Sequence, residues 1–302
     1  MKFSILITTK NRLSDLMISL NSMQSIINRD DVEFIICDDG SIDGTSEYIE
    51  NHFPKIHLIK NEVSKGYLAN RNKMLNRSKA QYAISLDDDA HFLSKNPLEE
   101  IEKHFEENSN CSLIAFRIFW GNKEPKSLNS IDKEERVKGF VGCGHAWRIA
   151  TWRVIPNYPE WFGFFGEEDF ASFQLFKNNL EVHYLPSVLI HHRVDIIARK
   201  KNNDYLWRLR RSYRSGLYLC LLFYPLSKLP KILIYMLWIQ LKTRTFKGDF
   251  KATVVIFQVF GDVFVNLPKI LKQSNRFTNE EYRNYLKLTE TKIYWKTNEQ
   301  EL

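Results

Sequence analysis

The apolar and polar positions of the first two hundred residues follow two alternating periods. Four short apolar runs, rich in β-branched residues, have the length of buried strands: 3–9, 32–37, 56–60 and 82–86. Apolar residues recur about every 3.6 positions in 13–27 and 68–75, which predicts helices. Strands that alternate with helices indicate an α/β fold with a mostly parallel sheet covered by helices on both faces.

The pattern is less regular from residue 112 to residue 195. Two apolar runs, 113–120 and 182–190, predict strands, 140–145 is a glycine-rich turn, and 168–177 has the pattern of a short helix. The composition changes again near residue 200, where basic and aromatic residues become frequent. We therefore expect an α/β domain over 1–198 and a helical C-terminal region over 199–302.

Composition adds few constraints of its own. A hydrophobic content of 44% and a charged content of 26% are typical of a globular chain. The four cysteines are scattered without metal-ligand spacing, which favours buried thiols in a reducing compartment: Cys37, Cys111, Cys143 and Cys220. The first apolar run is too short for the core of a secretion signal, so we expect a cytoplasmic protein.

Polar and acidic clusters follow three of the predicted strands, at 8–11, 38–39 and 87–89. Ligands of open α/β sheets bind at the carboxyl ends of the strands. Three adjacent carboxylates repel each other near a buried strand end, and a divalent cation that also contacts phosphates relieves this repulsion. Alternation along the chain would turn Asp87 and Asp89 to one side and Asp88 to the other. A solvated acidic turn is the alternative.

Two later segments carry further candidates. The acids of 166–170 follow an aromatic run, a setting that suits a general base, although acids also favour the first turn of any helix. His191 and His192 end the strand predicted at 182–190, and one imidazole could complete a metal site. An ordinary, partly buried histidine pair is the alternative.

These motifs, in this order, resemble those of glycosyltransferase family 2, whose members are inverting enzymes with the GT-A fold. The resemblance covers about residues 1–195. The matching segments are ITTKNR at 7–12, CDDGSIDGT at 37–45, KGY and RN within 65–72, LDDD at 86–89 and GEEDF at 166–170, with His191 after the late strand. A less specific glycine turn lies at 142–145.

The resemblance implies roles for individual residues. Contacts with the nucleotide sugar would come from Thr8, Thr9, Asn11, Asp38, Asp39, Lys65, Arg71, Asp87 and Asp88. Asp89 and His191 would hold a Mg²⁺ or Mn²⁺ ion on the donor diphosphate, where the metal stabilises the leaving group.

The catalytic base follows from the same resemblance. Asp169 would accept the proton of the acceptor hydroxyl, with inversion at the anomeric carbon. The family often has a second acid and an arginine further along, where this chain has Ala171 and Leu175. Glu167 or Glu168 could therefore share the role of the base.

Charge is concentrated in the C-terminal region. Residues 199–247 hold twelve basic residues and one acid, a net +11 in a chain of +7, so the rest of the chain carries −4. The apolar runs 217–226 and 232–241 are too short to span a membrane, and a segment lying on anionic lipid fits them. Helices packed on the first domain are the alternative. Nucleic acid is not an expected partner, because no nucleic-acid-binding motif accompanies the arginines.

The sequence therefore predicts a nucleotide-sugar-dependent transferase that acts on a glycan or a lipid-linked acceptor in the synthesis of cell-surface polysaccharide or lipopolysaccharide. We expect it at the inner face of the plasma membrane. Two other classes stay open. A sugar nucleotidyltransferase also uses paired aspartates, but it would have a glycine-rich loop after the first strand, and 8–12 contain no glycine. A catalytically inactive membrane adaptor of the same fold is the other.

Overall fold

The structure is a computed structural model that describes residues 1–194 and 204–295. Its strands are β1 (Phe3–Thr9), β2 (Val32–Asp38), β3 (Ile56–Lys60), β4 (Tyr82–Asp87), β5 (Ala90–Phe92), β6 (Cys111–Trp120), β7 (Glu135–Val137), β8 (Gly144–Arg148) and β9 (Glu181–His192). Its α-helices are α1 (Leu13–Ser22), α2 (Gln24–Ile27), α3 (Thr45–His52), α4 (Tyr67–Arg77), α5 (Pro97–Glu107), α6 (Ile149–Trp152), α7 (Glu167–Lys177), α9 (Tyr205–Phe223), α10 (Leu229–Thr243), α11 (Phe250–Gln273) and α12 (Asn279–Leu286).

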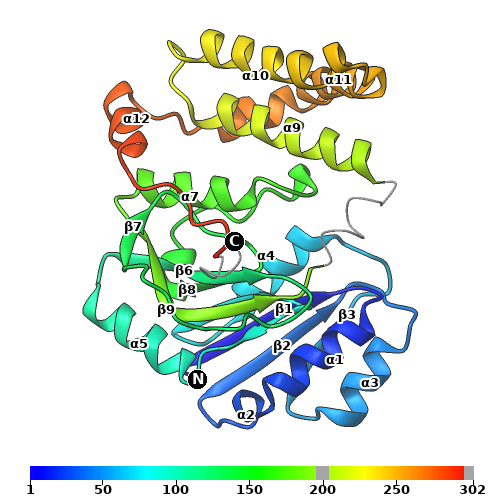
Figure 1. The fold of residues 1–302 in the computed structure, drawn as a ribbon, viewed down its shortest axis with the longest axis vertical. Coiled ribbons are helices and arrows are strands. Elements are labelled where there is room, and N and C mark those ends of the chain that lie inside the picture. Colours follow the sequence, from blue (N-terminus) through cyan, green and yellow to red (C-terminus); the bar gives the residue numbers. More distant parts are fainter. Residues whose placement is uncertain (195–203, 296–302) are drawn as a thin grey trace.

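The strands form one nine-stranded mixed sheet (Figure 1). Its order is β3-β2-β1-β4-β8-β6-β9-β5, with β7 paired to β9. The first four strands in this order are parallel, as the alternation of strands and helices predicted. Strand β8 then runs antiparallel between β4 and β6, and β6 pairs with β9 in parallel. The carboxyl ends of β1, β2 and β4 therefore meet at one edge of the sheet.

Two large cores cover the two faces of this sheet. One joins the strands to α1, α3 and α5. The other joins them to α4 and α7, and also to buried residues of α9, α11 and α12. In Figure 1 the C-terminal helices lie beyond α7, on the side of the sheet opposite α1 and α3. The C-terminal region thus shares a hydrophobic core with the sheet, as the packing alternative predicted.

The local pattern predicted the parallel strands within one or two residues, but it missed other elements. Strand β8 begins at Gly144, inside the segment that we expected to be a turn. Helix α9 joins the basic and aromatic run to the apolar run after it, because one face of the helix is buried and the other carries the arginines. The expected domain boundary at 198/199 lies outside the described residues, as do Arg199, Lys200 and Lys201.

Helices α10 and α11 extend away from the sheet. A third, smaller core joins α11 to α9. Within the described residues, α11 is the one helix that is long and apolar enough to cross a membrane, judged by length and composition over Phe250–Lys272. Core helices of water-soluble proteins can meet the same criterion, but only 22% of the most apolar window of this helix is buried. Its apolar side chains are therefore mostly exposed.

The shared core predicts that α9 contributes to the stability of the first domain. Phe223 of α9 is fully buried, and its ring contacts those of Phe170, Phe173 and Phe277. Phe223→Ala should lower the free energy of unfolding by about 3–5 kcal/mol, because it leaves a cavity between helices. The control Phe257→Ala, at a position 72% exposed, should change the free energy of unfolding by less than about 0.5 kcal/mol. Urea unfolding followed by tryptophan fluorescence measures both variants. Equally small losses would contradict this packing.

Candidate active site

A cleft of about 410 Å³ opens at the carboxyl ends of β1 and β4. The register pairs Thr9 with Asp38 and Thr8 with Asp87, so β1, β2 and β4 end at one level. The residues that line the cleft come from these strand ends and the end of β9, from the loops after β3 and η1 (Glu160–Phe162), and from the starts of α4 and α9: Thr8, Thr9, Lys10, Arg12, Asp39, Ser64, Gly66, Tyr67, Asp87, Asp88, Asp89, Gly163, Phe164, His192, Trp207, Arg208 and Arg211.

The three aspartates after β4 point in alternating directions, as expected for an extended chain. Asp87 and Asp89 lie on the same side as His192, and one ligand atom of each lies within 4.8 Å of the other two. Asp88 points the other way, where Thr9 Oγ1 donates a hydrogen bond of 2.9 Å to its Oδ2. Two carboxylates and one imidazole at such distances are a donor set that fits Mg²⁺ or Mn²⁺.

Asp89 is held between two cationic side chains. Its Oδ2 lies 2.6 Å from Arg12 Nη2, and its Oδ1 lies 3.0 Å from His192 Nε2. Burial alone would raise the pKa of Asp89, but the neighbouring His192 and Arg12 outweigh it and lower the pKa to about 2. Asp89 is therefore ionised at neutral pH, as a metal ligand must be.

The other two aspartates differ in their surroundings. Burial raises the pKa of Asp88 to about 7, and the Arg12 guanidinium, whose Nε lies 3.3 Å from Asp88 Oδ1, only partly offsets this. Asp87 is bound by α4, where Arg71 Nη2 lies 2.8 Å from its Oδ1 and Tyr67 donates a hydrogen bond of 3.2 Å to the same oxygen. The acidic cluster is therefore compensated by side chains from three other segments of the chain.

The structure places His192 beside the aspartates, where the sequence analysis had placed His191. Successive side chains of a strand point to opposite faces, so only one of the two can turn toward Asp89. His191 turns away, and its Nε2 lies 2.7 Å from the backbone oxygen of Gly121. The geometry therefore favours His192 over His191 as the histidine beside Asp89.

Asp39 organises the loop that forms one wall of the cleft. Its carboxylate accepts hydrogen bonds from the backbone amides of Lys65 and Gly66 at 2.7 and 3.1 Å, and from Ser64 Oγ and Asn61 Nδ2 at 2.6 and 2.9 Å. Burial would raise the pKa of Asp39, but these donors lower it to about 2. Asp39 therefore shapes the cleft in addition to lining it.

Asp38 and Asn11 lie just outside this lining. Asp38 accepts hydrogen bonds from the Ser41 amide at 2.9 Å and from Ser46 Oγ at 2.5 Å, so it fixes the turn after β2. Asn11 has a φ of 51° and accepts a hydrogen bond from the Ile42 amide at 2.8 Å. Both side chains join the turn after β2 to its neighbours instead of facing the cleft.

Glu168, at the start of α7, contacts the Gly142 segment beside Arg71 and Tyr67. Its Oε1 accepts a hydrogen bond of 3.2 Å from the backbone amide of Gly142. A Cβ at Gly142 would lie 2.8 Å from this oxygen, 3.3 Å from Arg71 Nη1 and 3.5 Å from the Tyr67 hydroxyl, so these groups gather around Gly142. Burial raises the pKa of Glu168 above its ordinary value, and Arg71 only partly offsets this.

Asp169 points away from the cleft. Burial raises the pKa values of Cys220 and Tyr285, and the charge of Asp169 raises them further, so its carboxylate lies toward α9 and α12. Neighbouring helical positions are about 100° apart around the axis, so Asp169 and Glu168 point in different directions. The sequence analysis placed the base at Asp169, whereas the geometry favours Glu168.

The first turns of α9 close one side of the cleft. The Trp207 ring lies 5.8 Å from Phe164, which in turn lies 5.7 Å from Tyr67, so three rings cross this side. The Arg211 guanidinium stacks on Trp207 at 3.9 Å. With Arg208, Arg211 brings positive charge to a cleft that is acidic at its base, an arrangement suited to an anion such as a diphosphate.

The structure thus brings together most of the residues predicted from the sequence. The residues that line the cleft include Thr8, Thr9, Asp39, Asp87, Asp88 and Asp89, whereas Arg71 and Lys65 lie next to lining residues. The sequence analysis named Arg12, Gly66, Tyr67 and His192 within its motifs but gave them no individual role, and it assigned no site role to Ser64, Phe164, Trp207, Arg208 or Arg211. For the α9 residues the only signal was the mixture of rings and arginines, which we had interpreted as a lipid-facing segment.

A mixed sheet with an acidic cluster and a cleft at its carboxyl edge is the arrangement of an α/β enzyme that binds ligands at the ends of its strands. The chain matches the model of glycosyl transferase family 2 over residues 4–158, about half its length, and therefore belongs to that family. This confirms the predicted glycosyltransferase at the level of the family. No curated protein matches the chain in sequence.

Solved structures establish the GT-A fold. TarS 1–349 from S. aureus, solved also with UDP and with UDP-GlcNAc, is 18% identical, with a TM-score of 0.52 over 72% of this chain and 66% of TarS 1–349. GalNAc-T7 with UDP, GalNAc and Mn²⁺ is 13% identical, with a TM-score of 0.59 over 75% of this chain and 49% of the GalNAc-T7 chain. The mannosyltransferase PcManGT from Pyrobaculum calidifontis, with GDP-Man and Mn²⁺, is 13% identical, with a TM-score of 0.55 over 94% of this chain and 83% of the PcManGT chain. The chain thus spans less than two thirds of the first two.

Proposed function

We propose that this chain transfers a sugar from a nucleoside diphosphate donor to an acceptor hydroxyl. The observation that carries the proposal is the convergence of Asp87, Asp89 and His192 with two arginines of α9 around one cleft. Similar structures hold UDP-GlcNAc or GDP-Man, which supports a donor of this class. The anionic diphosphate would lie between the acidic base of the cleft, through a cation, and the guanidinium groups of Arg208 and Arg211.

A divalent cation belongs to this proposal. Asp87, Asp89 and His192 would hold it, and the Mn²⁺ in two of the similar structures supports Mg²⁺ or Mn²⁺. When bound, the metal supplies positive charge that stabilises the departing diphosphate. Arg12 keeps Asp89 oriented through the contact of 2.6 Å between Arg12 Nη2 and Asp89 Oδ2.

Glu168 is the proposed general base. It would accept the proton of the acceptor hydroxyl while that oxygen attacks the anomeric carbon and the bond from that carbon to the diphosphate oxygen breaks. A raised pKa makes its carboxylate a better proton acceptor, and the Gly142 amide keeps its Oε1 in place. One base, without a second carboxylate assigned as a nucleophile, supports inversion at the anomeric carbon.

The acceptor side of the proposal rests on the outer surface of α10 and α11. On α11, Phe250, Phe257, Phe264 and Leu271 are spaced seven residues apart, and each is at least 64% exposed. On α10, Ile234, Tyr235 and Trp238 are also exposed. We call these seven residues the apolar stripe. An exposed apolar surface of this kind marks an interaction site, and a membrane interface would cover it.

Basic residues accompany the apolar stripe on the same helices and between them: Lys231, Lys242, Arg244, Lys247, Lys251, Lys269 and Lys272. Positive charge beside apolar side chains complements anionic lipid headgroups. Attachment through this surface at the inner face of the plasma membrane would hold the cleft near a lipid-linked acceptor. We therefore propose a role in the synthesis of cell-surface polysaccharide or lipopolysaccharide.

The assignment of the base predicts different effects at neighbouring positions. Glu168→Gln should lower turnover by about 10²–10⁴-fold while donor binding is kept, because the isosteric amide cannot accept the proton. The control Asp169→Asn should leave turnover close to that of the unaltered chain. The measurement is release of nucleoside diphosphate at saturating donor. The opposite ranking would return the role to Asp169, and release of pyrophosphate would indicate a nucleotidyltransferase.

The raised pKa of Glu168 predicts an acid limb in the pH profile. The base acts in its ionised form, so turnover should be full above its pKa and should fall as the pH drops through it. Because burial raises this pKa, the midpoint should lie above 4.5, the ordinary value for glutamate. A turnover that stays constant down to that ordinary value would contradict Glu168 as the base.

The metal assignment predicts a contrast between adjacent histidines. His192→Ala and Asp89→Ala should each weaken Mn²⁺ binding at least about tenfold in the presence of UDP, because loss of even an outer-shell partner has effects of this size. His191→Ala is the matched control and should bind Mn²⁺ as the unaltered chain does. The free Mn²⁺ signal in electron paramagnetic resonance measures this. Equal losses at both histidines would show that the ligand set is wrong.

Membrane attachment predicts that the apolar stripe is required for binding to vesicles. The double variant Phe257→Ser, Phe264→Ser should lose flotation with vesicles that contain phosphatidylglycerol, because both side chains are more than 70% exposed and would enter the lipid. Ile131→Ser, at a position 86% exposed on the first domain, is the control and should float normally. Failure of the unaltered chain to bind any vesicle would reject the attachment.

A further inference from the structure

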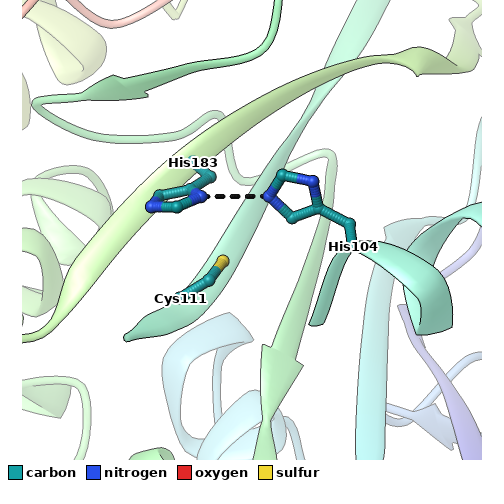
Figure 2. A group of neighbouring side chains, drawn as sticks. All are labelled: His104, Cys111 and His183. Carbon is teal, nitrogen blue, oxygen red and sulfur yellow. Dashed lines mark hydrogen bonds between the residues drawn. The ribbon is translucent and has the colours of Figure 1, made fainter. Parts of the chain in front are cut away.

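A second cluster of metal-binding side chains lies on the sheet away from the cleft. It consists of His104 near the end of α5, Cys111 at the start of β6 and His183 near the start of β9. Figure 2 shows the two imidazoles facing each other, with the cysteine sulfur beside them. One ligand atom from each residue lies within 4.8 Å of the other two. We refer to the three residues as the His-Cys-His cluster.

The pairing of β6 with β9 explains how the cluster forms. Cys111 pairs with Glu181, so the two side chains lie on the same face, and His183 follows on that face two residues later. Helix α5 covers the face and brings His104 to it. His183 lies 72 residues after Cys111, so the three ligands do not form one short metal-binding motif in the sequence.

The outer nitrogens of both histidines face carboxylates. His183 Nε2 lies 2.8 Å from Glu181 Oε2, and His104 Nδ1 lies 3.3 Å from Glu134 Oε2. A carboxylate beside one ring nitrogen keeps the proton there, which leaves the lone pair on the other nitrogen. Histidine ligands of metal ions are oriented by carboxylates in this way.

In the tautomers that these carboxylates favour, the inner nitrogens face each other as two lone pairs. His104 Nε2 and His183 Nδ1 are 3.0 Å apart. Two lone pairs at this distance repel each other unless a cation or an added proton lies between them. A metal ion between the rings would satisfy both nitrogens.

We propose that the His-Cys-His cluster binds Zn²⁺. Two imidazole nitrogens and one thiolate are the ligand types that zinc prefers, and water would complete a tetrahedron. The ion would also compensate the buried Cys111 thiolate and the nearby carboxylates of Glu134 and Glu181. It would tie α5 to the starts of β6 and β9.

This site differs from the cleft in both place and chemistry. The partners of His183 and His192 on β6 are Ile114 and Trp120, which lie six residues apart, and this corresponds to roughly 20 Å along a strand at about 3.3 Å per residue. The cleft offers two carboxylates and one imidazole, which suit Mg²⁺ or Mn²⁺, whereas a thiolate selects zinc. Zinc in the cluster therefore neither requires nor replaces a metal in the cleft.

The test uses Co²⁺ and Zn²⁺ on the full chain after removal of metals by a chelator. Added Co²⁺ should give a near-ultraviolet band of cobalt–thiolate bonding and intense visible bands of tetrahedral cobalt, and about one Zn²⁺ per chain should abolish them. Cys111→Ser should lose the near-ultraviolet band. Cys220→Ser is the matched control at another buried cysteine and should keep it. A band that survives in Cys111→Ser would overturn the site.

A second measurement does not depend on the folding of a cysteine variant. Glu181→Gln keeps all three ligands and should weaken Zn²⁺ binding by about 10–100-fold, because the outer-shell carboxylate is lost. Zn²⁺ should raise the melting temperature of the metal-free unaltered chain, and the rise at the same Zn²⁺ concentration should be smaller in Glu181→Gln. A metal-free protein that binds neither Zn²⁺ nor Co²⁺ would reject the proposal.

Discussion

The compensation of charge at the end of β4 is the constraint on which the site depends. Three carboxylates follow a buried strand, and each is costly to bury unless a cation or a hydrogen-bond donor lies beside it. Arg12 comes from the loop after β1, Arg71 from α4 and His192 from the end of β9. Because each partner belongs to a different element, the acidic cluster is stable only in the assembled fold, and the same assembly creates the cleft.

The C-terminal region has two faces with different roles. Phe223 and other buried residues fasten it to α7, and the first turns of α9 place Trp207 and Arg211 at the cleft. Its outer face on α10 and α11 carries exposed aromatic residues. One helix thus connects the core, the cleft and the exposed surface. This arrangement supports the proposal that an acceptor held at a membrane reaches the site from this side.

Local patterns in the sequence were sufficient for the parallel strands and for the aspartates at their ends, since both depend on neighbouring residues. They were insufficient where direction matters. The choice of His192 over His191 depends on which side chain at the end of β9 turns toward Asp89, and the choice of Glu168 over Asp169 depends on the rotation of α7. The role of the α9 arginines depends on packing between segments some 120–200 residues apart. The residue types in a motif do not specify the direction of a side chain or the packing between distant segments.

The most direct test of the central claim is a crystal of the chain with Mn²⁺ and a nucleoside diphosphate, with anomalous diffraction used to locate the metal. The account predicts an anomalous peak bounded by Asp87, Asp89 and His192, with the diphosphate between this peak and Arg211. A peak away from these residues, or a nucleotide bound on another surface, would contradict the convergence on which the proposed function rests.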